Sequence, residues 1–205
     1  MDNNNQNQIE ELDENHLVQV RKEKLKALIE AGKNPYEITE FNRTHVTTEI
    51  FENYDELEGK EVAIAGRIMG KRIMGKASFA HVQDPYGKIQ LYVSVNDLGE
   101  ESYKAFKEDD IGDIVGVKGF VFKTKTGEIS IHAKDIVLLT KTLRPFPDKF
   151  KGLKDVDLRY RHRELDLIVN PKVKETFVKR IQILRRNKKI LKWKRIFRSW
   201  NTNTT

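Results

Sequence analysis

Side chains that can bind nucleic-acid bases alternate with apolar residues between residues 61 and 140 of this 205-residue chain. An aromatic ring offers a base a stacking surface, worth about 1–3 kcal/mol per base. Glutamine and glutamate can hydrogen-bond to base edges, and arginine can hold a phosphate or stack. The side chains in this pattern are Arg67, Phe79, Gln90, Tyr92, Glu128 and His132. They predict a surface for single-stranded RNA, with an ordinary solvated face as the alternative.

Motifs for metal binding and nucleotide hydrolysis do not accompany this surface. The spacing of the histidines fits no zinc or iron site, and their positions are His16, His45, His81, His132 and His162. Cysteine is absent, which excludes disulfides and thiolate ligands. The run GKRIMGK does not match the P-loop pattern, although Lys71, Arg72 and Lys76 in it are candidate phosphate contacts. These residues predict a binding module without a metal site.

The elements that must position the surface are strands, because apolar residues recur with a period of two from Glu61 to Thr140. Three strands are predicted in EVAIAGRIM, SFAHVQD and KIQLYV, followed by a helix in GEESYKAFKEDD and strands in DIVGVKGFVFKT and EISIHAKDIVLL. Gly70 and Gly75 predict a bend or bulge after the first strand. This order predicts a mainly β fold, a five-stranded OB-fold Greek-key barrel with a short helix between strands 3 and 4. An SH3-like barrel is the alternative.

Other segments flank the predicted barrel at 61–140. Residues 1–14 are polar and are predicted to be disordered, and residues 15–60 are predicted to form an N-terminal helix, over 15–32, and a connection. Residues 141–180 are predicted to be a linker and the start of a further domain, and residues 181–205 form a basic tail. The N-terminus has no signal-peptide pattern, and no apolar run is long enough to span a membrane.

The net charge of +7 does not by itself indicate a nucleic-acid partner. Ten lysines and arginines lie between Lys179 and Arg198, and no acidic residue follows Glu175. Without those ten, 28 basic residues stand against 31 acidic residues. The positive excess therefore belongs to the end of the chain, and RNA binding by the barrel must depend on where individual charges lie.

The sequence closely resembles bacterial lysyl-tRNA synthetases, which are class II enzymes, over about residues 15–180. The resemblance is carried in order by GR, KRIMGKASF, FKTKTGE, LRPFPDKF and RYRHRELDL. It implies an N-terminal OB domain that binds the anticodon of lysine tRNA. It further implies that Phe79 stacks on the central anticodon base, that Gln90 and Glu128 help to read uridines, and that Arg67 and Arg72 contact the anticodon stem-loop.

The resemblance also implies that full-length members are cytoplasmic homodimers that use ATP and Mg²⁺ to attach lysine to tRNA. Positions matching the family's ATP, Mg²⁺ and lysine sites, and its dimer-forming motif 1, have no counterparts in this sequence. We therefore expect no catalytic residue, no cofactor bound by this chain and no aminoacylation by the chain alone. The alternatives are a stand-alone OB-fold protein that binds single strands, a non-functional truncated product, or a fragment of an aspartyl- or asparaginyl-type synthetase. The FKTKTGE and RYRHRELDL runs argue against the last of these.

The resemblance stops near Ile181, where NKKILKWKRIFRSWNTNTT is rich in Lys, Arg, Asn and Thr. With A/T-rich codons, reading residues 187–205 one nucleotide downstream yields IRKYLNGKEYLEVGTPIL, which resembles the family's motif 1 region. We hypothesise a frameshift at about residues 181–187, which the nucleotide sequence beyond codon 180 would test. The alternative is a basic amphipathic tail that binds RNA or an anionic membrane surface.

Overall fold

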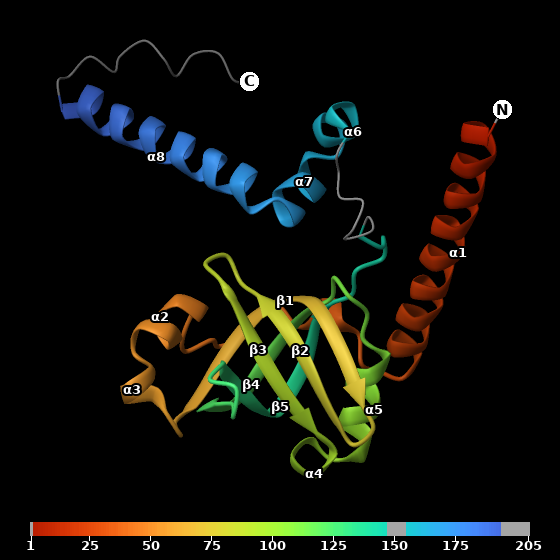
Figure 1. Cartoon of the computed structure of the whole chain (residues 1–205), viewed down its shortest axis with the longest axis vertical. Helices are drawn as coiled ribbons and strands as arrows, with labels where there is room; N and C mark the ends of the chain where they lie inside the picture. Colours follow the sequence, from red (N-terminus) through yellow and green to blue (C-terminus); the bar gives the residue numbers. More distant parts are fainter. Residues whose placement is uncertain (1, 147–154, 194–205) are drawn as a thin grey trace. The chain divides into compact units, whose positions relative to one another are not determined.

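The computed structural model describes residues 2–146 and 155–193, and it describes side chains over 15–146 and 155–190 (Figure 1). The described residues fall into two compact units that divide between Pro145 and Phe146. Parts of the predicted linker, at 147–154, and of the predicted tail, at 194–205, lie outside the described residues. None of the described helices is both long and apolar enough to cross a membrane.

The first unit is built on a closed barrel of five strands, which confirms the predicted OB-fold (Figure 1). The strands are β1 (Glu61–Met74), β2 (Ala77–Gln83), β3 (Lys88–Ser94), β4 (Ile114–Lys123) and β5 (Ile129–Thr140). They pair in the order β1-β2-β3-β5-β4, and the parallel pairing of β3 with β5 closes the barrel. The helices α4 (Val95–Leu98) and α5 (Glu100–Glu108) lie between β3 and β4; α5 is the helix predicted there, and α4 precedes it.

Alternation along the strands separates a buried core from an outer face. The inward positions of β1, β2 and β3 include Ile64, Ile68, Val82 and Leu91, all of which are at most 1% exposed. Ile131 of β5 is fully buried among them. Because side chains on a strand alternate between the two faces, these inward positions leave the residues between them on the outside of the barrel.

A bulge in β1 re-aims its outer residues. The register of β1 against β2 shifts between Ile68 and Gly70, so that Ile68 pairs with Val82 and Gly70 pairs with His81. Beyond the bulge Lys71 lies on the inward side, as the partner of Ala80. The predicted bend is thus confirmed at Gly70, and Gly75 forms the following turn with a φ of 65°, in the left-handed region that favours glycine.

The N-terminal helix is longer than predicted. Helix α1 runs from Asp2 to Glu30, so the structure differs from the expectation of a disordered tail over residues 1–14. The physical reason is that extending an existing helix avoids the cost of nucleation, and the glutamates and glutamines of this stretch are good helix formers. Helix α1 ends as predicted near Gly32, which has a φ of 69°. Short helices η1 (Pro35–Glu37), α2 (Thr47–Glu52) and α3 (Tyr54–Leu57) lead to β1.

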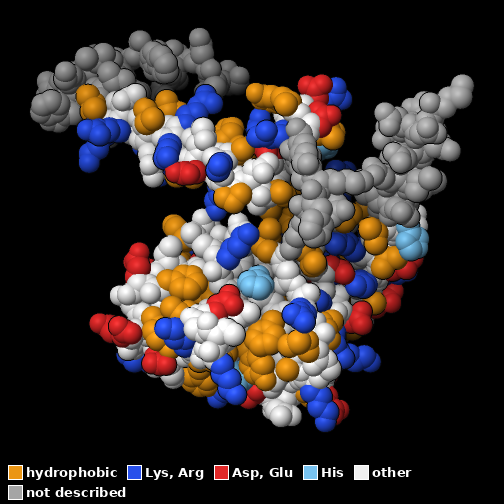
Figure 2. Space-filling model, in the orientation of Figure 1, with side chains coloured by type: hydrophobic (Ala, Val, Ile, Leu, Met, Phe, Trp, Pro, Cys, Tyr) orange, Lys and Arg blue, Asp and Glu red, His pale blue; other side chains and the backbone are white. Residues whose placement is uncertain are grey.

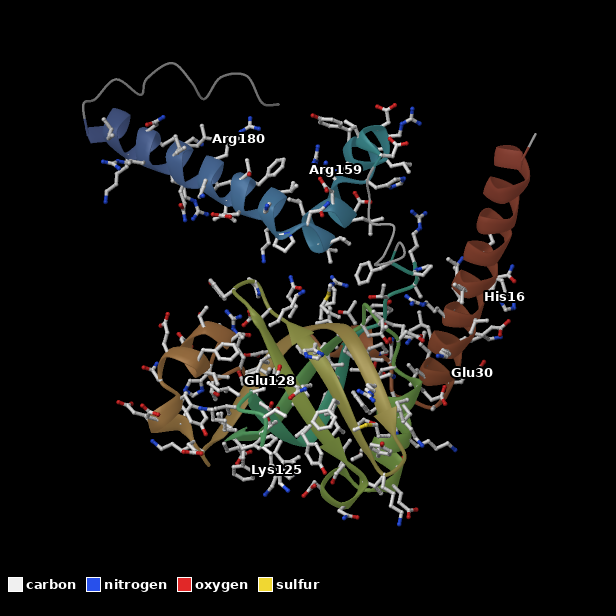
Figure 3. All side chains as sticks on the ribbon, in the orientation of Figure 1. His16, Glu30, Lys125, Glu128, Arg159 and Arg180 are labelled. Carbon is white, nitrogen blue, oxygen red and sulfur yellow. The ribbon has the colours of Figure 1, made fainter. Side chains whose placement is uncertain are left out.

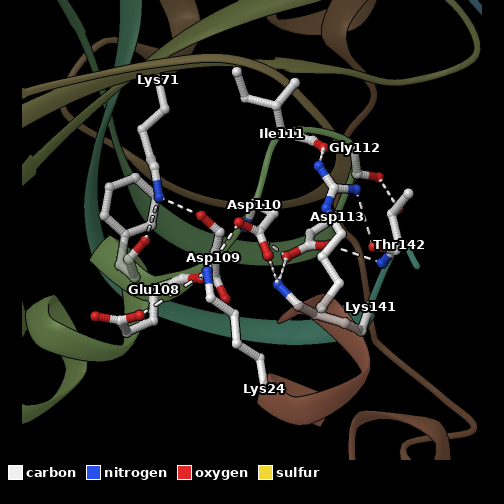
Figure 4. A network of polar contacts seen from close by, with 12 residues as sticks. Lys24, Lys71, Glu108, Asp109, Asp110, Ile111, Gly112, Asp113, Lys141 and Thr142 are labelled. Carbon is white, nitrogen blue, oxygen red and sulfur yellow. Dashed lines mark hydrogen bonds and ion pairs between the residues drawn. The ribbon is translucent and has the colours of Figure 1, made fainter. Parts of the chain in front are cut away.

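A polar network joins α1 to the turn before β4 and to the residues after β5 (Figure 4). The buried Lys141 ammonium lies 2.6 Å from a carboxylate oxygen of Asp110 and 2.6 Å from one of Asp113. Lys24 of α1 lies 3.0 Å from Asp110, and Arg21 donates to the backbone carbonyl of Thr142 at 3.1 Å. These charged and polar contacts help to hold the helix to the barrel.

Lys71 and Asp109 lie at the edge of this network. Lys71 donates to the carbonyls of Phe106 and Lys107, both at 3.0 Å, and also to that of Asp109, and so caps the end of α5. Burial raises the pKa of Asp109 to about 7, with a further rise from the neighbouring Asp113 carboxylate. Asp109 is therefore a partly buried acid beside a second carboxylate, that of Asp113.

The second unit contains α6 (Val156–Arg161), α7 (Arg163–Val169) and α8 (Pro171–Trp193). Its short helices are tied together by Asp166, whose buried carboxylate accepts from Arg159 at 3.0 Å, Arg163 at 2.5 Å and Asn170 at 2.6 Å. Pro171 begins α8, where its missing N–H costs nothing. The described part of the predicted basic tail continues this helix, and its side chains through residue 190 are exposed.

Candidate nucleic-acid interface

One row of outward side chains crosses the barrel from strand to strand. Arg72 of β1 pairs with Phe79 of β2, and Phe79 pairs with Tyr92 of β3. Tyr92 in turn pairs with His132 of β5. The row ends on β4, where Phe120 pairs with His132. Paired residues share a face of the sheet and lie within contact distance of one another. Residues far apart in the sequence therefore form one continuous stripe.

Four rings of this region form an aromatic cluster, defined here as Phe79, Tyr92, Phe122 and His132. The Tyr92 ring centroid lies 5.3 Å from that of Phe79, 6.2 Å from that of Phe122 and 5.0 Å from that of His132. All four side chains are partly exposed. Figure 2 shows hydrophobic side chains gathered on the front of the barrel, with lysines and arginines around them. The cluster is thus an apolar platform open to solvent.

A hydrogen bond fixes the orientation of Gln90, which lies beside the aromatic cluster on β3. The buried Ser130 hydroxyl donates to Gln90 Oε1 at 2.9 Å. Because the carbonyl end of the amide is taken, its NH₂ end is the part directed toward a ligand. Gln90 therefore presents hydrogen-bond donors at the surface, which suits a base carbonyl.

Glu128 approaches the same surface from the turn between β4 and β5 (Figure 3). The turn is closed by Thr124, whose N–H donates to the Glu128 carbonyl at 2.9 Å and whose hydroxyl accepts from the Glu128 N–H at 2.9 Å. The Glu128 carboxylate lies 3.8 Å from Nε2 of His81, the cross-strand partner of Gln90. The structure thus brings a carboxylate acceptor close to the Gln90 donors.

Cationic side chains lie around the aromatic cluster. Arg72 is exposed beside Phe79, and Lys134 stands over the Phe120 ring with its ammonium 4.2 Å from the ring centroid. Lys125, in the β4–β5 turn, is also exposed (Figure 3). Such charges can contact the phosphates of an RNA whose bases lie on the platform.

Arg67 occupies a different place from the other predicted site residues. It pairs with Gln83 on the far side of the β1 bulge, and its guanidinium donates to the Gly112 carbonyl at 2.6 Å. Burial lowers the pKa of Arg67, and the nearby Asp113 carboxylate partly opposes that effect. Of the five predicted residues, the structure gathers Arg72, Phe79, Gln90 and Glu128, whereas Arg67 is engaged with the barrel's own backbone. Its contact with RNA stays a prediction.

Two outer aromatic residues of β4, Phe120 and Phe122, were not among the residues predicted for this surface. The signal was present, since Val115, Val117 and Val121 are buried and the residues between them must face outward. Tyr92 and His132 were expected on the outer face, but neither was assigned a role; Nε2 of His132 lies 2.8 Å from Asp97. Hydrogen bonds from Ser94 and then from His132 lower the pKa of Asp97.

The described residues include no group of three histidine, aspartate or glutamate side chains placed to hold a metal ion. The arrangement of the interface is instead that of a binding surface. It combines an aromatic platform, a fixed set of amide donors, a carboxylate acceptor and surrounding cations. These are the groups with which proteins hold unstacked bases of single-stranded RNA.

Comparisons with known proteins agree with this geometry. Residues 62–139 match the family model described as an OB-fold nucleic acid binding domain, for tRNA anticodons. The chain is 56% identical over 171 residues to the lysine–tRNA ligase of Clostridium novyi, covering 83% of this chain and 34% of the relative. It is 53% identical over 176 residues to that of Clostridium tetani, covering 86% and 35%. The chain thus spans about a third of the length of the curated relatives it matches.

Proposed function

We propose that this chain corresponds to the N-terminal part of a lysine–tRNA ligase, and that the outer face of its OB domain binds the anticodon loop of a lysine tRNA. The observation that carries this proposal is the aromatic cluster, with Gln90 and Glu128 beside it on one face of the barrel. In the complete ligase, which joins lysine to tRNA with ATP and Mg²⁺, this part would supply recognition of the tRNA.

Phe79 supports the proposal as a stacking platform. Its ring is partly exposed and is held from the side by Tyr92, at a centroid distance of 5.3 Å and an interplanar angle of 57°. A tilted neighbour restrains the Phe79 ring while leaving room above it for a base. Stacking of one base on such a ring contributes about 1–3 kcal/mol to binding.

Gln90 and Glu128 give the platform a preference among bases. A uracil offers two carbonyl oxygens and one N3–H donor on its pairing edge, so it complements amide donors and a carboxylate acceptor. Cytosine carries an unprotonated N3 in the same position, which a carboxylate repels. Since lysine anticodons are rich in uridine, the pairing of these two side chains suits the proposed ligand.

Arg72 and the lysines around the platform would contact the phosphates of the loop. Phosphate contacts contribute affinity without sequence preference, and they weaken as salt displaces the released counterions. We place Arg67 in the same group as a proposed contact to the anticodon stem-loop, since the residue is only partly buried.

Binding of short RNA hairpins tests this function directly. The chain should bind an anticodon stem-loop with a UUU anticodon more tightly than one with an unrelated anticodon. Phe79→Ala should weaken binding of the UUU hairpin by about fivefold to 150-fold, which corresponds to the loss of one stacked base at about 1–3 kcal/mol. Fluorescence anisotropy would give both affinities.

Phe51→Ala is the matched control, because Phe51 is an exposed phenylalanine on α2, away from the aromatic cluster. It should leave RNA binding unchanged. Equal binding of hairpins with unrelated anticodons would refute the proposal and favour a general single-strand-binding OB protein.

A further inference from the structure

We propose that His81 is a positioning residue for Glu128, and that its protonated form sharpens the discrimination of uridine from cytidine at this interface. The inference rests on the proposed function and concerns a residue to which neither the family resemblance nor the aromatic cluster assigns a role. It identifies a specificity determinant that acts through Glu128 rather than by stacking on the base.

The position of His81 supports this role. It lies on β2 between Gly70 of β1 and Gln90 of β3, in the outward row next to that of the aromatic cluster. Its Nε2 is 3.8 Å from Glu128 Oε1, with the two side chains 49% and 50% exposed. Because Gly70 carries no side chain, the imidazole can adjust on that side while the Glu128 carboxylate stays within its reach.

The charged groups around His81 can be named strand by strand. On β1 the next outward residue is Arg72, and on β3 the outward residue two positions before Gln90 is Lys88. Glu128 is the one carboxylate within ion-pair distance of His81 in the described part of the chain. Protonation of His81 would therefore act on a single acidic partner, which is one of the two proposed base-reading side chains.

The chemistry of the pair explains the effect on specificity. An imidazolium has an N–H on both ring nitrogens, so it donates to Glu128 whichever tautomer the neutral ring favours. Attraction of Oε1 toward the charged His81 ring, from the present 3.8 Å, would leave the second carboxylate oxygen available to accept the N3–H of a uracil. A neutral ring donates from one nitrogen only and lacks the positive charge that attracts the carboxylate.

The test measures discrimination rather than affinity alone. We would determine the dissociation constants of the UUU hairpin and of three hairpins, each with one anticodon uridine replaced by cytidine. Histidine charge generally changes across the range from about pH 5.5 to about pH 7.5, so both ends would be measured. For the uridine read by Glu128, the uridine-to-cytidine preference should rise by about two- to fivefold toward the acidic end, as expected of an exposed ion pair.

His81→Gln is the matched variant, because its amide can still donate to Glu128 but does not titrate. It should bind the UUU hairpin and show a preference that does not change with pH. Glu128→Gln should lower the preference at both ends and also remove its pH dependence. Thermal unfolding of each variant would establish that the barrel is retained.

Two results would overturn the role of His81 while leaving the proposed function intact. One is a His81→Gln variant with the pH dependence of the wild-type chain. The other is a wild-type chain whose affinities for all four hairpins rise together at acidic pH, which would make His81 a simple phosphate contact. Failure of the wild-type chain to prefer the UUU hairpin over an unrelated one at either pH would instead refute the proposed function itself.

Discussion

At the scale of single residues, a buried side chain can determine which hydrogen-bonding group its neighbour presents at the surface. Ser130 is fully buried, yet its hydroxyl determines which end of the Gln90 amide faces outward, through a bond of 2.9 Å. An unrestrained glutamine can present either its carbonyl or its NH₂ group, and so can accept either of two base edges. The restraint therefore converts an ambiguous side chain into a donor.

Ser130→Ala tests this restraint. Without the hydroxyl, Gln90 can rotate its amide, so RNA binding should weaken by about 0.5–1.5 kcal/mol, the usual net value of one hydrogen bond. The loss should be larger for the UUU hairpin than for its cytidine variants, measured by anisotropy. Ser102→Ala, at an exposed serine of α5, is the control and should bind as the wild-type chain does.

Residue types revealed part of this interface from the sequence alone. Alternation placed Phe79, Gln90 and Glu128 on one outer face, and the structure brings them together. Arg67 obeys the same alternation, but the bulge after Ile68 separates it from the others. The effect of a bulge on register, and the choice of partner for a long charged side chain, depend on contacts between strands that a single sequence does not display.

At the scale of elements, the interface depends on the close approach of β4 to β5. Gly119 pairs with Ala133, and a Cβ added there would lie 2.1 Å from the His132 carbonyl oxygen. The neighbour is backbone, so it cannot move aside as a flexible side chain would. The absence of a side chain at Gly119 thus allows β4 to pair closely with β5 and to place the Phe122 ring 5.9 Å from that of His132.

Gly119→Ala should therefore separate the two strands locally. We expect the free energy of unfolding to fall by about 1–3 kcal/mol, the usual cost of overpacking, measured by chemical denaturation. RNA binding should weaken as well, because His132 leaves its place in the aromatic cluster. Lys118→Ala, at the exposed preceding position, should change stability little, and an equal loss in both variants would contradict the explanation.

At the scale of the whole molecule, stability should depend on pH through Asp109. Its pKa is about 7 in the folded chain, against an ordinary value near 4, so between these values the folded state holds a proton that the unfolded state has lost. The contribution is fully present below about pH 4 and is lost as the pH rises through 7. The free energy of unfolding should accordingly fall across this interval.

Asp109→Asn removes this titration. The variant should be more stable than the wild-type chain at about pH 8, by roughly 1–2 kcal/mol, and should differ least near pH 4. Denaturation curves at the two pH values would show it, with Asp135→Asn as the control at an exposed aspartate of β5. Wild-type and Asp109→Asn curves that stay parallel across the interval would contradict a raised pKa for Asp109.

The overall architecture was predictable where local pattern determines it and less so elsewhere. The period of two and the intervening helix predicted the OB-fold, since each strand shows its buried face in its own residues. The first turns of α1 were not predicted, because a polar stretch carries no apolar pattern, and its helix depends on continuity with the segment that follows. The polar network that joins α1 to the residues before β4 and after β5 was not predicted either. Its members come from segments up to 123 positions apart in the sequence.

The parallel pairing of β3 with β5 has a consequence for how the chain folds. It joins Gln90 to Ser130 across 40 positions, whereas β2 and β3 meet through a short turn. Closing a long loop costs more entropy, so we expect the β2–β3 hairpin to form early and the barrel to close late. An open intermediate would hold Phe79 and Tyr92 without His132 or Ser130, and so would lack a complete reading surface. RNA should then bind the closed barrel selectively. Bound RNA should therefore lower the rate at which the closed barrel opens again.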